Sequence, residues 1–296
     1  MSFVGGVGYS NIDLIYSGLD RLPDKGEEIF ARGFSMQFGG GIPATMINLS
    51  RLGVESRIIT FAGHDLFSEF VKKTLNSYPV KTVNLYKGNK MPVVLSSTLL
   101  YCGDRSFISY TDGMDLNDAV MDEVYENLKG AYVVDMHVGF LDVYKRLKKD
   151  GCIQIFDTGW EDDLTLEKYR DYLEIADYYI PNQKEAMKIT GTSSVEAAAD
   201  VLSEFFSDVT IKMDKEGCLL KNKDGIKIIS SVQNVKAIDA TGAGDAFCAG
   251  TSAGLTYGKS MLEAMKIGSH LASSVIASCE NVCPCFSQDK FDIVKK

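Results

Sequence analysis

The sequence has few of the residues that build disulfide frameworks, zinc sites or catalytic histidine pairs. Its three histidines, His64, His137 and His270, lie far apart, and its seven cysteines show no CxxC spacing. An odd set of cysteines without such spacing argues against a disulfide framework and against a zinc site. The one cluster, Cys283 and Cys285, has no matching histidine or cysteine ligands, so we expect reduced thiols there.

Long apolar runs and basic residues are also scarce. No stretch approaches the length of a membrane-spanning helix, and the opening residues MSFVGGVGYSN show no basic segment followed by an apolar run. We therefore expect a cytoplasmic protein. Lysine and arginine total 31 against 40 aspartates and glutamates, for a net charge of -9, so the overall field repels polyanions. Nucleic acids and anionic membranes are thus excluded as expected partners.

What the 296 residues do contain is an alternation of short apolar runs with helix-length amphipathic stretches. This pattern is typical of a parallel sheet covered on both faces, and it predicts a three-layer α/β fold on a doubly wound, mostly parallel sheet. We expect strands within residues 2–8, 56–63, 131–138, 152–159, 177–182, 208–213, 217–222 and 225–231. We expect helices within residues 42–53, 65–78, 117–130, 141–151, 195–206, 244–257 and 261–278.

Two segments, residues 15–38 and 91–111, interrupt the alternation with predicted strands and turns but no helix. Because both leave the α/β pattern and return to it, we expect them to pair as a small β-sheet lid. The core would then comprise residues 1–14, 39–90 and 112–296. The exposed strand edges of such a lid could pair with a second copy, which would make the protein a homodimer.

The stretch GGVGYSN, at the end of the first predicted strand, is similar to part of the dinucleotide-binding fingerprint of oxidoreductases. Glu27 or Glu28, about 20 residues later, would be the ribose-binding acid. The third glycine is missing and no convincing helix follows to bind a pyrophosphate, so we reject this alternative. Asn11 and Asp13 follow at alternate positions, at the end of a buried strand where ligands commonly bind, and we expect both to contact a ligand.

The most informative stretch is DATGAGDAF, at residues 239–247. Gly242 and Gly244 would expose the backbone at the start of a predicted helix, so that the N–H groups of residues 243–245 form an anion hole. Asp245 stands beside that hole. An isolated aspartate at a helix start is more often a cap than a catalyst. A carboxylate next to an anion hole nevertheless suits phosphoryl transfer to a hydroxyl.

Four motifs in chain order resemble those of the ribokinase-like, or PfkB, carbohydrate kinases, over nearly the whole chain. DATGAGDAF is similar to the family signature D-T-x-G-A-G-D, with Ala240 in place of the threonine. ADYYIPNQKEAMKITG resembles the N-x-x-E segment, with Asn182 and Glu185 at the matching positions. FGGGIPATMINLSRLG resembles the glycine-rich sugar-site signature, and GYSNIDLIY with LPDKGEE resembles the first strand and lid segment.

The resemblance implies an ATP-dependent kinase that phosphorylates a primary hydroxyl of a small sugar beneath the lid. Asp245 would be the catalytic base, beside an anion hole formed by Gly242, Ala243 and Gly244. The sugar would be held by Asn11, Asp13, Gly39, Gly40 and Gly41. An unperturbed aspartate has a pKa of about 3.9, so we expect Asp245 to orient the hydroxyl rather than act as a strong base.

On the nucleotide side, the resemblance implies that Asn182 and Glu185 act on Mg²⁺ and phosphate, with Glu185 reaching the metal through water. The same two residues also fit a capping box at a helix start, and both interpretations can hold together. Lys212 and Gly217 would lie beside the nucleotide. Many relatives bind a monovalent cation, and K⁺ would then be held near Asp239.

The chain departs from the family pattern in ways that leave its substrate open. Ala44 stands where the family usually has a sugar-contacting asparagine. In IKMDKEG, Lys212 and Asp214 replace a threonine and a glycine of the nucleotide motif, and only Gly217 remains. Lys212 could reach the nucleotide phosphates or could be a solvated lysine at a strand end.

Two alternatives to a sugar kinase stay open. A nucleoside kinase of the same fold would use aromatic side chains to stack on a base, and candidates are Tyr9, Phe107, Tyr110 and Trp160. A non-catalytic, sugar-binding regulatory protein on the same fold is the other alternative. The intact Asp245, with Asn182 and Glu185, argues against it.

Overall fold

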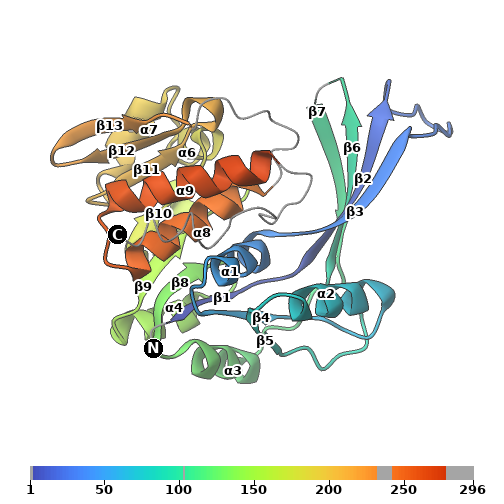
Figure 1. The fold of residues 1–296 in the computed structure, drawn as a ribbon, viewed down its shortest axis with the longest axis horizontal. Coiled ribbons are helices and arrows are strands. Elements are labelled where there is room, and N and C mark those ends of the chain that lie inside the picture. Colours follow the sequence, from blue (N-terminus) through green and yellow to red (C-terminus); the bar gives the residue numbers. More distant parts are fainter. Residues whose placement is uncertain (1–2, 103, 232–241, 278–296) are drawn as a thin grey trace.

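The computed structural model describes residues 3–102, 104–231 and 242–277. Four residues named above, Asp239, Ala240, Cys283 and Cys285, lie outside the described residues. A core of strands covered by helices carries a separate sheet that projects from one side (Figure 1). Within the described part of the chain, no helix is long and apolar enough to cross a membrane.

Six parallel strands form the central sheet, in the order β10-β9-β8-β1-β4-β5. They are β1 (Phe3–Val7), β4 (Ser56–Thr60), β5 (Lys81–Asn84), β8 (Ala131–Met136), β9 (Ile153–Phe156) and β10 (Tyr178–Tyr179). All residues of β1 are buried. The chain first builds the sheet outward from β1 through β4 to β5, and then returns to add β8 on the other side of β1. Such a reversal opens a crevice at the carboxyl ends of the strands, where ligands bind in open α/β sheets.

Helices cover both faces of this sheet, which confirms the predicted three layers. One apolar cluster packs against α1 (Gly41–Arg51), α2 (Leu66–Asn76), α8 (Ala243–Thr256) and α9 (Met261–Ile276). The other packs against α3 (Asp118–Leu128), α4 (Leu141–Lys149), α5 (Leu166–Ile175), α6 (Gln183–Thr190) and α7 (Val195–Leu202). The two clusters bury the opposite sides of the same strands, since Val4 belongs to the first and Phe3 and Val7 belong to the second.

Beyond β10 the sheet continues as an antiparallel meander. Strands β11 (Val209–Lys212), β12 (Cys218–Asn222) and β13 (Gly225–Ile229) pair in sequence order. An isolated parallel bridge between Asn182 and Lys212 joins β11 to the chain after β10. This bridge sets the end of β11 directly beside the start of α6.

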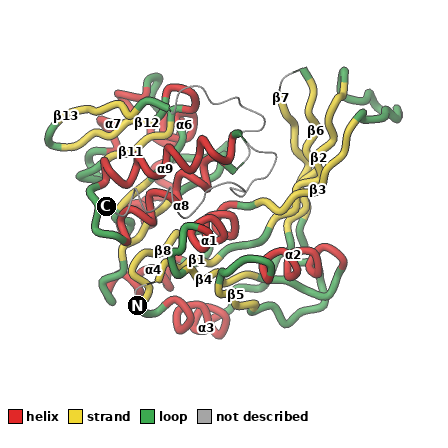
Figure 2. The backbone as a smooth tube through the Cα atoms, viewed as in Figure 1, coloured by secondary structure: helices red, strands yellow, loops and turns green. Residues whose placement is uncertain are grey.

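The predicted lid is present as a four-stranded sheet in the order β3-β2-β6-β7. Its strands are β2 (Asn11–Leu19), β3 (Gly33–Gly39), β6 (Val94–Tyr101) and β7 (Asp104–Tyr110). Figure 2 shows these strands standing clear of the helices of the core. Asn11 and Asp13 therefore do not end the buried first strand, as the sequence suggested, but begin the first strand of the lid.

Two glycines of GGVGYSN, Gly6 and Gly8, allow close packing against α1. A Cβ on Gly6 would lie 2.4 Å from Cγ2 of Ile42, and one on Gly8 would lie 3.1 Å from Cβ of Ile42. No room is left there for a side chain. Because these glycines have no side chain, α1 can pack closely against the sheet. This packing explains the glycines without a bound dinucleotide.

Candidate active site

A cavity of about 790 Å³ lies at the carboxyl ends of β8 and β9, between the N-termini of α1 and α8 and the end of β11. Of the predicted site residues, those lining it are Gly41, Asn182, Glu185, Lys212, Gly217, Ala243, Gly244 and Asp245. The structure thus brings together residues from the glycine-rich segment, the N-x-x-E segment and DATGAGDAF. Their assigned roles stay predictions, but their common location is a fact of the fold.

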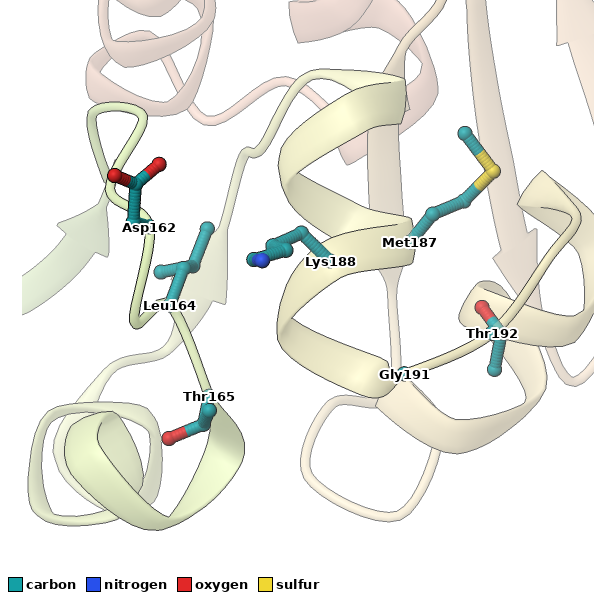
Figure 3. A pocket seen from close by; sticks show the side chains of 7 residues that line it. All are labelled: Asp162, Leu164, Thr165, Met187, Lys188, Gly191 and Thr192. Atoms are coloured by element: carbon teal, nitrogen blue, oxygen red, sulfur yellow. The ribbon is translucent and has the colours of Figure 1, made fainter.

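A second hollow, of about 520 Å³, lies between α6 and the loop that leads into α5. Lys188 of α6 points toward the loop residues Asp162 and Leu164 (Figure 3). None of the predicted site residues lines this hollow. We therefore place the candidate active site in the larger cavity.

The N-terminus of α8 is open toward the larger cavity. Its N-cap, Gly242, has φ 78°, a left-handed conformation that favours glycine, and no side chain caps the helix. The first-turn N–H groups therefore have no side-chain acceptor from a cap. Asp245 lies in that first turn without capping it. Asp245 is therefore not the cap of the helix to which it belongs.

The carboxylate of Asp245 is instead held by the other helix that begins at the cavity. The backbone N–H of Gly41, the first residue of α1, donates to it, and α1 has no side-chain cap of its own. The Thr45 hydroxyl in the next turn donates to the backbone carbonyl of Asp245 over 3.3 Å. Asp245 therefore sits between two helix N-termini, one from each end of the chain.

The surroundings of Asp245 change the expectation drawn from its ordinary pKa. Burial raises the pKa of Asp245, the charges of Asp157 and Asp13 raise it further, and Lys212 and the Gly41 N–H lower it. The result is a pKa of about 7. Sequence reasoning started from a solvated aspartate and therefore made this group too weak a base.

Lys212 is not the solvated strand-end lysine that the sequence left open. Its Nζ lies 2.7 Å from Oδ2 of Asp157, and its side chain is only 14% exposed. Burial opposes the charge, but the carboxylates of Asp157 and Glu185 outweigh it, so the pKa of the Lys212 ammonium is raised. Thus Lys212 stays charged inside the cavity.

Asn182 and Glu185 form the expected capping box at the start of α6. The Glu185 N–H donates to Oδ1 of Asn182 over 2.9 Å, and the Asn182 N–H donates to Oε2 of Glu185 over 2.8 Å. Burial, followed by the charge of Asp157, raises the pKa of Glu185 to about 7. Both residues also line the cavity, so a structural role and a role toward a ligand are compatible.

The predicted sugar contacts gather where the lid meets α1. The Asn11 side-chain amide donates to Oδ1 of Asp13 over 2.9 Å, and the Ser96 hydroxyl of β6 donates to Oδ1 of Asn11 over 3.3 Å. A Cβ on Gly39 would lie 2.4 Å from Oδ2 of Asp13, and one on Gly40 would lie 2.7 Å from Cβ of Asn11. The glycines therefore allow the carboxylate and the amide to sit against the backbone that leads into α1.

Gly217, predicted to lie beside the nucleotide, lines the cavity at a position that requires glycine. It has φ 98° after the short helix at Asp214–Glu216, and a Cβ there would lie 1.9 Å from the carbonyl oxygen of Ile229. No other residue fits this turn without moving β13. Asp214, which replaces a family glycine, also has a positive φ of 50° and accepts a hydrogen bond from Gln183.

Two acids of the cavity were not predicted as site residues: Asp135, which is buried, and Asp157, whose side chain is 28% exposed. Asp135, at the end of β8, is 4% exposed, and its Oδ1 accepts from the Ser252 hydroxyl of α8 over 3.3 Å. Burial raises its pKa to about 8. The only signal was the position of both acids at the carboxyl ends of predicted strands, in VVDMH and FDTGW.

The aromatic residues proposed for a nucleobase do not line the cavity. Phe107, Tyr110 and Trp160 are each more than half exposed, and Tyr9 packs on Phe61 with ring centroids 5.3 Å apart. Their positions therefore do not support a stacking site for a nucleobase in this cavity.

A three-layer α/β core, a β lid and an acid beside an open helix N-terminus are the features that the sequence motifs predicted for a small-molecule kinase. The profile described as "pfkB family carbohydrate kinase" matches residues 1–285, and the chain therefore belongs to this family. It is an ATP-dependent carbohydrate kinase.

Relatives extend over most of the chain. Ribokinase from Lactococcus lactis is 22% identical over 281 residues, which are 92% of this chain and 91% of that protein. Deoxyribokinase from Salmonella typhi is 24% identical over 262 residues, 81% of each. The structure of Arabidopsis thaliana ribokinase with ribose and ATP has a TM-score of 0.81 and 22% identity, and the match covers 100% of this chain and 99% of that one.

Proposed function

We propose that the protein transfers the terminal phosphoryl group of ATP to a primary hydroxyl of a small sugar. One observation carries the proposal: the Asp245 carboxylate lies between the N-terminus of α1 and the uncapped N-terminus of α8. A carboxylate in this place can accept the alcohol proton while the N–H groups of α8 face the moving phosphoryl group.

In this reaction the sugar oxygen forms a bond to the terminal phosphorus as the bond from that phosphorus to the bridging oxygen breaks. The hydroxyl proton passes to Asp245, and ADP leaves with the bridging oxygen and its electron pair. The backbone at Gly242, Ala243 and Gly244 is the anion hole. Because its pKa is raised to about 7, Asp245 accepts a proton more readily than an exposed aspartate would.

The sugar lies at the base of the lid in this proposal. Its hydroxyls are held by Asn11, Asp13 and the backbone of Gly39, Gly40 and Gly41. The support is the joint position of these groups at the start of α1, whose first residue binds Asp245. The ribokinase and deoxyribokinase relatives favour a pentose or a sugar of similar size.

The nucleotide lies over the half of the cavity formed by Asn182, Glu185, Lys212 and Gly217. Among the described residues no group of three histidine, cysteine, aspartate or glutamate side chains could hold a metal ion. A Mg²⁺ ion held mainly by ATP phosphates and water, with Glu185 in its outer shell, fits these residues and would neutralise phosphate charge. A K⁺ site near Asp239 and a homodimer through the lid belong to the same proposal, as does a cytoplasmic location, where ATP is available.

The test is a coupled ADP-release screen over pentoses, ketohexoses, sugar phosphates, amino-sugar conjugates and nucleosides. The Asp245→Asn protein is the blank, because it keeps the fold of the site and loses the proton acceptor. We expect a signal with at least one free sugar and none with the blank. A signal confined to nucleosides would favour the nucleoside kinase, and no signal above the blank would favour the non-catalytic protein.

A further inference from the structure

The ion pair between Lys212 and Asp157 lies where charge must change during phosphoryl transfer. Lys212 ends β11, and its backbone N–H is fixed by the carbonyl of Pro181 over 2.9 Å. Its side chain then crosses toward α8, where a Cβ on Gly244 would lie 3.5 Å from the ammonium nitrogen. The ammonium therefore lies beside the first turn of α8, next to the N–H groups that face the cavity.

Asp157 binds this ammonium through one carboxylate oxygen. Its Oδ2 accepts from Lys212 and, over 3.3 Å, from the Cys248 thiol of α8. Its other oxygen, Oδ1, is buried without a hydrogen-bond partner among the described residues. The Asp157 side chain is 28% exposed, and a part-buried carboxylate with so few donors is costly unless its one charged partner stays in place.

The charge balance of the cavity shows why a fixed cation is needed there. Of the described residues that line the cavity, two are lysines and five carry carboxylates: Asp135, Asp157, Glu185, Asp214 and Asp245. Burial keeps Asp135, with a pKa of about 8, mostly protonated near neutral pH, but the remaining acids still outnumber the two lysines that a nucleotide polyphosphate would meet on entering this space. Lys212 is the lining lysine that is paired with one of these carboxylates and placed at the helix end.

We propose that Lys212 stabilises the phosphoryl group during its transfer and that Asp157 is the positioning residue that holds the Lys212 ammonium against the N-terminus of α8. As the phosphorus moves from the bridging oxygen of ATP to the sugar oxygen, its peripheral oxygens stay within reach of the ammonium. The proton still passes from the sugar hydroxyl to Asp245, and ADP still leaves with the bridging oxygen. Asp157 forms and breaks no bond.

This inference rests on the proposed kinase function, and a double-mutant cycle tests it separately. The variants are Lys212→Met, Asp157→Asn and the two combined, assayed with the best sugar from the screen. We expect Lys212→Met to lower kcat by about 10²-fold or more, as removal of a transition-state donor does. Asp157→Asn should lower kcat by about tenfold, with the KM for the sugar changed less than about threefold. When it is added to Lys212→Met, Asp157→Asn should change kcat by less than about twofold, because it has no lysine left to hold.

Two further variants separate function from folding. Lys212→Arg keeps the positive charge and should regain at least about tenfold in kcat over Lys212→Met. The control is Lys148→Met, which breaks another Lys–Asp pair, with Asp177, in which Lys148 Nζ lies 2.6 Å from Oδ1 of a half-buried carboxylate. It should leave kcat unchanged. Thermal unfolding of every variant shows whether the fold is intact.

The outcomes are distinct. An inactive wild-type protein would overturn the proposed function itself. An active wild type whose kcat survives Lys212→Met would overturn the role of Lys212. If Asp157→Asn lowered kcat by the same factor with Lys212 present and with Lys212 replaced, Asp157 would not act through the lysine. That result would overturn its positioning role.

Discussion

The Thr45 hydroxyl in α1 donates a hydrogen bond of 3.3 Å to the backbone carbonyl of Asp245 in α8, 200 residues further along the chain. The preceding turn of α1 supplies the Gly41 N–H that binds the Asp245 carboxylate. Two helices that begin at glycines are thereby fixed with their N-termini facing one cavity. The proposed sugar half and the proposed nucleotide half of the site meet at this contact.

Removal of the Thr45 hydroxyl should abolish its hydrogen bond to Asp245 without leaving a cavity in the core. Thr45 is only 3% exposed, and valine has nearly the same shape. We expect Thr45→Val to destabilise the fold by about 1 kcal/mol and to lower kcat by several-fold, because Asp245 is less well held. Thermal unfolding and steady-state kinetics measure the two effects. An unchanged kcat would show that the contact does not position Asp245.

The rate should depend on pH through Asp245. Its pKa is raised to about 7, and it must be deprotonated to accept the hydroxyl proton, so kcat/KM for the sugar should rise through about pH 7 and level off above it. Asp157 and Asp13 raise this pKa and Lys212 lowers it. The rising limb should therefore move to lower pH in Asp157→Asn and to higher pH in Lys212→Met. Shifts in the same direction would contradict the arrangement of these charges.

Gly39 should matter for the sugar and not for the nucleotide. A Cβ there would lie 2.4 Å from Oδ2 of Asp13, so Gly39→Ala must displace that carboxylate. We expect the KM for the sugar to rise by about tenfold or more, with the KM for ATP nearly unchanged. Ser35→Ala, at an exposed position on the same strand, is the matched control. Equal changes in both KM values would point to general damage.

Asp135 should limit the stability of the protein at alkaline pH. Burial raises its folded-state pKa to about 8, whereas an unfolded aspartate titrates near 3.9, so the folded state binds more protons between these values. The unfolding free energy therefore falls as pH rises from 4 to 8. Asp135→Asn removes the charge, and its advantage over the wild type should grow by on the order of 2 kcal/mol between pH 5 and pH 8. A difference that stays constant with pH, in thermal unfolding at both values, would contradict the raised pKa.

The sequence was a good guide to the core and a poorer one to segments without clear periodicity. Alternating apolar runs located β1, β4, β8 and β9 and most helices. The pattern indicated no strand at β5, where Val83 is the one apolar residue of KTVN, and no helix at α5, where only three of the ten residues of LEKYRDYLEI are aliphatic. Strand β5 and helix α5 are both stabilised by packing against neighbouring elements. A local sequence pattern carries no information about such packing.

The site was predictable where motifs carry it and not where contacts between distant residues make it. DATGAGDAF predicted the open helix end at Gly242, which a single left-handed glycine confirms. The partner of Lys212 is Asp157, 55 residues away, and nothing in either local stretch indicates the pairing. The pKa of Asp245 is likewise set by burial and by charges from other elements.

The most direct test of the account is the turnover of Asp245→Asn. Single-turnover phosphoryl transfer to the best sugar of the screen is measured beside ATP and sugar binding by calorimetry. If Asp245 is the catalytic base, we expect near-normal binding of both ligands and a rate lower by about 10² to 10⁴. The substitution removes the proton acceptor and leaves the shape of the cavity unchanged. Retention of more than about a tenth of the wild-type rate would contradict the role of Asp245 as catalytic base.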